Sequence, residues 1–160
     1  MTQVLAAAPR PVWFHVVLGG FVLATLDLIF ACTFWAVLRD VPPVRILQSI
    51  AAGVQGEAAF AGGNGSALLG LVCHYFIATT MVLAYTLVAA RVRILLQRPL
   101  AYGLAYGLLL YVLMSHVVVP LSNAPRPTNV YLPWIVASII MHAVFGVICA
   151  WSARRALPGR

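Results

Sequence analysis

Residues 14–38 read FHVVLGGFVLATLDLIFACTFWAVL, a long apolar run that contains a single acidic residue, Asp27. A helix needs about 20 apolar residues to cross the hydrocarbon core of a bilayer, and this run exceeds that length. Three later runs also meet the requirement, at residues 67–90, 100–120 and 131–153. The sequence therefore predicts four membrane-spanning helices.

The composition also indicates that a bilayer surrounds most of the chain. Of the 160 residues, 63% are hydrophobic and only 8% are charged, whereas a soluble domain carries about 25% charged residues. All ten basic residues are arginines that flank the apolar runs. The net charge of +7 therefore indicates a positive-inside topology and contact with anionic lipid, and we expect no nucleic-acid partner. The lack of lysine beside abundant Ala, Gly, Leu and Val is typical of a high-GC bacterial genome.

We expect an all-α membrane protein in which residues 1–160 form a single transmembrane domain. Because two of the three connections are short, the natural architecture is a four-helix up-down bundle. The side that holds both termini and the second loop carries seven arginines, and the opposite side carries three. This asymmetry predicts that both termini are cytoplasmic. The seven are Arg10, Arg91, Arg93, Arg98, Arg154, Arg155 and Arg160, and the three are Arg39, Arg45 and Arg126.

The first loop, residues 39–66, is the only long connection and lies on the predicted outer side. Within it, the apolar residues Ile46, Ile50 and Val54 recur every four residues. This spacing predicts a short helix lying in the outer interface. Residues 62–65 (GGNG) follow it and predict a flexible turn.

Depth in the bilayer can be counted along each helix at about 1.5 Å of rise per residue. By this count, Asp27 and His142 are the polar groups nearest the bilayer midplane. Each shares a helix face with a small residue, Gly20 for Asp27 and Gly146 for His142. An ionised carboxylate at the bilayer centre costs about 2.5–3.5 kcal/mol, so Asp27 must be protonated or paired. Both residues are therefore candidates for binding a proton or a ligand; the alternative is a structural pair that fixes helix register.

His74 and His116 are candidates for holding a cofactor, which the sequence does not identify. Two histidines from different helices at compatible depth can ligate a haem, and a chlorophyll-type pigment needs only one. His74 also has a small neighbour, Gly70, on its face. The alternative is that both histidines are hydrogen-bonded between helices or lie near the outer edge.

Gly103 and Gly107 form a GxxxG pattern in the third run. This pattern predicts close helix packing and does not identify a partner. No set of catalytic residues and no metal-ligating spacing occurs in the sequence, since the three cysteines lie apart inside the apolar runs.

Several segments resemble the YagU-like family of bacterial inner-membrane proteins, in the family's order along most of the chain. They are Val41-Pro42-Pro43-Val44-Arg45, His74 with Tyr85, Pro120-Leu121, Leu132-Pro133-Trp134, and His142 followed by Arg154-Arg155. The resemblance implies an inner-membrane location and a loose association with acid tolerance. The family has no established catalytic residues to transfer.

These observations favour a small non-enzymatic membrane protein that responds to a ligand or to protons. It could equally serve as an accessory subunit that associates with other membrane subunits or with further copies of itself. One alternative is a haem- or pigment-binding electron-transfer subunit that uses His74 and His116. Another is a membrane enzyme acting on lipid or quinone, which would need a second acid or base near Asp27 or in the first loop, where only Asp40 and Glu57 are available.

Overall fold

The computed structural model of the chain describes residues 10–125 and 130–158. Every regular element in these ranges is a helix, and no strand occurs in them, so the all-α prediction is confirmed. In chain order the elements are α1 (Val12–Arg39), α2 (Pro43–Gln55), η1 (Gly56–Ala61), α3 (Gly63–Arg91), α4 (Ile94–Gln97), α5 (Pro99–Leu113), η2 (Met114–Val118), α6 (Val119–Leu121) and α7 (Leu132–Ala156).

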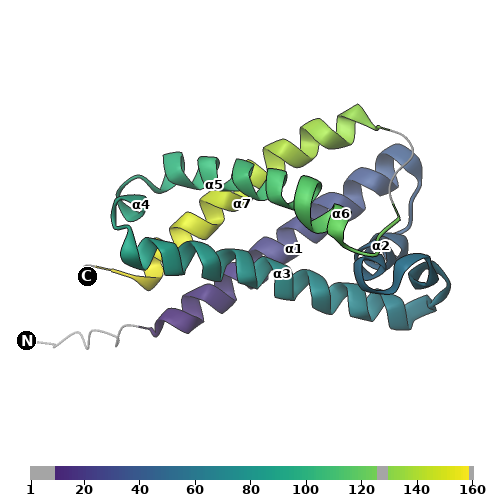
Figure 1. Ribbon diagram of the computed structural model, residues 1–160, viewed down its shortest axis with the longest axis horizontal. Coiled ribbons are helices and arrows are strands. Elements are labelled where there is room, and N and C mark those ends of the chain that lie inside the picture. The colour runs from purple at the N-terminus through teal and green to yellow at the C-terminus, as the bar shows by residue number, and fades with distance from the viewer. Residues whose placement is uncertain (1–9, 126–129, 159–160) are drawn as a thin grey trace, which may run out of the picture.

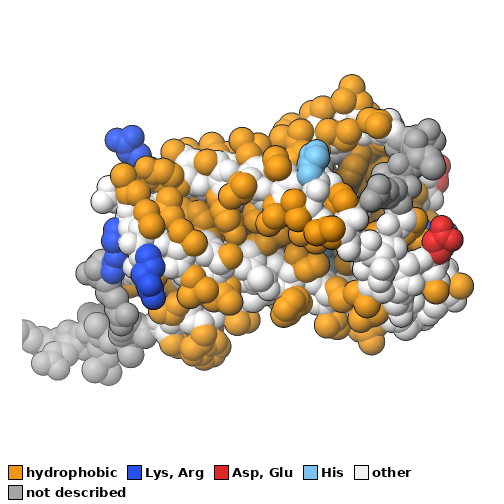
Figure 2. All heavy atoms as spheres, viewed as in Figure 1, with side chains coloured by type: hydrophobic (Ala, Val, Ile, Leu, Met, Phe, Trp, Pro, Cys, Tyr) orange, Lys and Arg blue, Asp and Glu red, His pale blue; other side chains and the backbone are white. Residues whose placement is uncertain are grey.

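Four helical stretches are long and apolar enough to cross a membrane: Val12–Arg39, Gly63–Arg91, Pro99–Leu121 and Leu132–Ala156. The third stretch joins α5, η2 and α6. Apolar side chains cover much of the face shown in Figure 2, and Phe21, Phe76 and Leu121 are each more than half exposed. Such a surface fits lipid better than water, and the chain is a small membrane protein.

The charged side chains lie mainly at the two ends of the molecule. The start of α1, the end of α7 and α4 lie at one end, and α2 lies at the other (Figure 1). On the face shown in Figure 2, the basic side chains lie at the first end and acidic ones at the second. Arg126 and Arg160, which the arginine count includes, lie outside the described residues.

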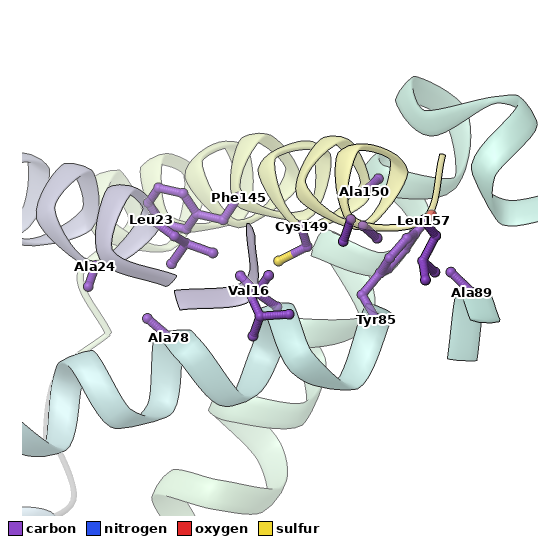
Figure 3. Packing of buried hydrophobic residues seen from close by; sticks show 13 residues of the cluster. Val16, Leu23, Ala24, Ala78, Tyr85, Ala89, Phe145, Cys149, Ala150 and Leu157 are labelled. Atoms are coloured by element: carbon purple, nitrogen blue, oxygen red, sulfur yellow. The ribbon is translucent and has the colours of Figure 1, made fainter. Parts of the chain in front are cut away.

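The main core lies between α1, α3 and α7 and consists largely of small side chains (Figure 3). Ala24, Ala78 and Ala150 are almost completely buried there, together with Val82 and Cys149. Because lipid is as apolar as these side chains, helices in a membrane gain little from burying apolar area against each other. Small residues instead allow close approach and dense van der Waals contact.

The glycines predicted for helix packing lie at such contacts. A methyl group at Gly103 or Gly107 of α5 would overlap the backbone of α7, and one at Gly146 of α7 would overlap α5. Gly20 faces Thr79 of α3 in the same way, and Gly70 faces the Leu47 carbonyl of α2. These glycines therefore set the spacing of three helix pairs.

Contacts within the first loop tie α2 to the start of α3, and one segment differs from its prediction. Gln48, one of the polar residues of α2, is buried against α3 and donates a hydrogen bond from Nε2 to the Gly63 carbonyl (3.1 Å). The GGNG segment is not a separate turn, because α3 begins at Gly63. The Ser66 hydroxyl donates to Oε1 of Gln55 (2.7 Å), which ties this first turn of α3 to the end of α2.

Candidate functional site

A cavity of about 390 Å³ lies where α1, α2, α3, α7 and the η2–α6 segment meet. Most of its walls are apolar, and three titratable side chains line it: Asp27 from α1, His74 from α3 and His142 from α7. Ser138 of α7 and Ser115 of η2 add hydroxyl groups. An apolar pocket in which a few polar groups converge is the usual form of a small-molecule site.

Asp27 and His74 form the closest pair of charged or chargeable groups in the cavity. Nε2 of His74 lies 3.7 Å from Oδ2 of Asp27, which is ion-pair range but longer than a hydrogen bond. The same Nε2 lies 3.1 Å from the Ala24 carbonyl oxygen. Because a carbonyl oxygen only accepts, Nε2 of His74 carries a proton, and Nδ1 is the atom that can take a second one.

The Asp27 carboxyl remains accessible from the cavity, since 28% of the side chain's surface is exposed, against 13% for His74. Within residues 10–125 and 130–158, the carboxyl oxygens make no hydrogen bond to another protein group. The carboxyl can therefore accept from a molecule bound in the cavity or exchange a proton with it. Sequence reasoning considered His142 as its partner; the structure places His74 closer.

His142 lines the same cavity but makes its own local contacts. Its Nδ1 lies 2.9 Å from the Ser138 carbonyl oxygen, one turn earlier in α7, and this bond assigns the Nδ1 proton. Nε2 is left as the free nitrogen of the neutral ring. Tyr111 of α5 and Phe145 flank the ring at centroid distances of 5.6 and 5.9 Å. His142 is thus held in place by packing, with one nitrogen free to accept.

The third span changes its winding where it meets the cavity. Met114–Val118 form a turn of π-helix, in which the Val119 amide donates to the Met114 carbonyl five residues earlier. Pro120 explains the change, because it has no amide hydrogen to donate to His116, four residues before, and its ring crowds that carbonyl. The wider turn directs Met114, Ser115 and Val118 to the cavity. Single π-turns within helices often occur at functional sites.

An aromatic wall closes the cavity between the end of α1 and the start of α7. Trp35 and Trp134 lie with ring centroids 5.2 Å apart, and Phe30 stacks on Trp134 at 5.9 Å. All three line the cavity and are half-buried. The preference of tryptophan for the membrane interface accounts for rings near helix ends, but no signal in the sequence brings Trp35 and Trp134 together.

Residues of α2 close another side of the cavity. Ile46 and Ile50, two members of the predicted apolar stripe, line it together with Ser49. The third member, Val54, is 59% exposed and does not line it. The stripe of α2 therefore faces the bundle over most of its length, and α2 acts as a wall of the site.

His116 does not join His74 in the cavity. It is exposed, and its Nδ1 lies 3.3 Å from the Val112 carbonyl oxygen of its own helix. The two histidines proposed as a haem-ligand pair therefore have different surroundings, and only His74 lines the cavity. Among the described residues, no group of three or more His, Cys, Asp or Glu side chains is arranged to hold a metal ion.

No family model matches the sequence, and comparison with curated proteins and with solved structures finds no similar protein. The site must therefore be interpreted from its own chemistry. It offers one accessible carboxyl, two imidazoles with assigned protons, and apolar and aromatic walls, all within a helix bundle that lipid can surround.

Proposed function

We propose that this chain is a proton-responsive ligand-binding protein of the bacterial inner membrane. Its ligand would be a small, mostly apolar molecule with a cationic group. One observation carries the proposal: the Asp27 carboxyl faces an otherwise largely apolar cavity, with His74 beside it and no hydrogen bond from another described residue. An ionisable residue inside a membrane protein is expensive to maintain unless it has a role.

The walls of the cavity support the choice of a cation. Carboxylates attract positive charge, and the faces of tryptophan and phenylalanine rings attract cations by about 0.5–2 kcal/mol each. Trp35, Trp134 and Phe30 provide such rings near one side of the cavity. Met81, Met114 and Met141 add deformable apolar surface that adapts to ligands of different shape.

Proton coupling follows from the Asp27–His74 pair. A cation binds well only when Asp27 is ionised and His74 is neutral, so binding releases any proton that either group held. By linkage, the affinity for a cation rises with pH while the Asp27 carboxyl loses its proton.

Binding of benzyltrimethylammonium to the full chain in lipid nanodiscs tests the proposal. The probe joins one aromatic ring to a permanent cation, so its own charge does not change with pH. We expect Asp27→Asn to weaken its binding at least about tenfold at neutral pH, because the ionic partner is lost. Asp40→Asn is the matched control, since Asp40 is exposed outside the cavity and asparagine tolerates its left-handed backbone (φ 52°).

Two outcomes would overturn the proposal. One is equal affinity of the wild-type and Asp27→Asn proteins for benzyltrimethylammonium. The other is an affinity of the wild-type protein that does not change between acidic and alkaline pH. Retention of helical content and of a single species in size-exclusion chromatography shows that each variant is folded.

The same proposal includes the placement of the chain in the membrane. We infer an up-down bundle of four spans with both termini in the cytoplasm, supported by the gathering of arginines near one end. We place α2 at the outer interface, where Ile46 and Ile50 close the cavity and Val54, at the end of the same stripe, meets lipid. Association with other membrane subunits or a second copy is tested by co-purification in mild detergent.

A further inference from the structure

A second hollow, of about 270 Å³, lies between α1 and α7. It shares no lining residue with the central cavity. Its lining residues are His15, Leu18, Gly19 and Val22 of α1 and Val147, Ile148, Trp151, Ser152 and Arg155 of α7. The groove is therefore separate from the proposed ligand site and needs its own explanation.

The groove changes from polar to apolar along its length. His15, Ser152 and Arg155 lie near the end of the molecule where α1 begins and α7 ends. At 1.5 Å of rise per residue, Val22 lies about 10 Å further into the bundle than His15, and Val147 about 12 Å further than Arg155. One end thus offers a cation and hydrogen-bonding groups, and the other offers an aliphatic surface.

The polar end carries unbalanced positive charge. The chain has only three acidic residues, and none of them lines the groove. Asp27 lines the central cavity, and Asp40 and Glu57 follow α1 and α2. Within the described ranges, Arg155 forms no ion pair. Arg154 lies over the ring of Trp151, at 5.7 Å from Cζ to the centroid, and keeps further positive charge beside the groove.

We infer that this groove binds an anionic phospholipid, with the phosphate against Arg155, His15 and Ser152 and an acyl chain along Leu18, Val22 and Val147. Basic pockets between transmembrane helices bind the head groups of anionic lipids in this way. Trp151, at the rim, suits the boundary between head group and acyl chain. A zwitterionic lipid brings the same phosphate, but its own cation offsets that charge, so the net positive charge of Arg154 and Arg155 would remain unbalanced.

Gly19 lies in the groove where α1 packs closely against α7. A methyl group there would overlap the Ser152 hydroxyl, so α1 and α7 approach closely only because the residue is glycine. This contact brings the Ser152 and His15 side chains to the same groove. The site is therefore formed by helix packing and not by one flexible arginine alone.

Native mass spectrometry of the full chain tests the inference, with lipids of identical acyl chains and different head groups. We expect phosphatidylglycerol to be retained more strongly than phosphatidylcholine. Arg155→Gln should lower that preference about fivefold, the effect of removing one basic residue near the head group. The matched control is Arg91→Gln, which removes an exposed arginine at the end of α3, outside the groove.

Val22→Trp fills the apolar part of the groove without changing its charge. We expect it to weaken phosphatidylglycerol binding, while the water-soluble head group sn-glycerol 3-phosphate fails to displace the lipid. Equal retention of the two lipids by the wild-type protein would overturn the inference. Equal losses in Arg155→Gln and Arg91→Gln would show diffuse charge only, and displacement by sn-glycerol 3-phosphate would show a free-phosphate site; either result also overturns it.

Discussion

Nε2 of His74 lies 3.7 Å from Oδ2 of Asp27 and also donates a hydrogen bond to the Ala24 carbonyl, one turn before Asp27 in α1. His74 thereby joins the carboxyl and the backbone of one transmembrane helix to another. Because the hydrogen bond to Ala24 fixes the ring, the distance from His74 to Asp27 is set by helix packing.

A double-mutant cycle measures the coupling of this pair. We expect Asp27→Asn and His74→Gln to change the free energy of unfolding non-additively, with an interaction energy of about 1 kcal/mol. Denaturation by sodium dodecyl sulfate in mixed micelles gives the four free energies. Tyr85→Phe provides the control. The Tyr85 hydroxyl donates to the Leu95 carbonyl (3.1 Å) near the C-terminal end of α3, so the effect of this substitution should add to that of Asp27→Asn. Additivity within error for the Asp27–His74 pair would show that the two groups do not interact.

The packing of α5 on α7 predicts a large effect at Gly107. We expect Gly107→Ala to lower the free energy of unfolding by about 1–3 kcal/mol, because the added methyl overlaps the His142 carbonyl and forces the helices apart. The same denaturation assay measures the change. Gly65→Ala, also in a helix but with open space around it, should cost nothing. Equal stability of the two variants would mean that α5 and α7 do not approach so closely.

The sequence predicts the helices well and their contacts only in part. Apolar run length is a local property, so four spans can be read directly from it. Small residues at i±4 similarly mark the faces that carry Gly103, Gly107 and Gly146. Periodicity shows which face of a helix packs against protein, but it does not show which helix packs there. Residue depths counted along straight helices also ignore the angles at which the helices cross. The pairing of Asp27 with His74 depends on that crossing.

The geometry of the third span also lies beyond sequence periodicity. Pro120 indicates a disturbed helix, but the same proline is compatible with a kink, a helix end or a π-turn. The structure has a π-turn, with His116 exposed and Met114 and Ser115 at the cavity. Likewise, the interface preference of tryptophan explains the positions of Trp35 and Trp134 along the chain, but not their contact with each other.

The separate surroundings of His74 and His116 predict the outcome of a test for haem. We expect no Soret band in the absorption spectrum of the protein purified from haem-replete cells, because bis-histidine ligation needs both imidazoles to face one site. His74 lines the cavity and His116 is exposed outside it. A Soret band that disappears in both His74→Ala and His116→Ala would contradict this expectation and restore the electron-transfer hypothesis.

The charge separation between the two ends predicts how the protein lies in the membrane. Arg93 belongs to the arginine-rich connection between α3 and α5, and Glu57 to η1 beyond α2, near the opposite end. Because positively charged connections stay in the cytoplasm, Glu57→Cys should react with a membrane-impermeant maleimide in intact cells. Arg93→Cys should react only after the cells are permeabilised. The native cysteines lie within α1, α3 and α7, and the wild-type protein controls for their labelling. Labelling of Arg93→Cys in intact cells, with protection of Glu57→Cys, would contradict the predicted orientation and place the Asp27 cavity, which α2 lines, nearer the cytoplasm.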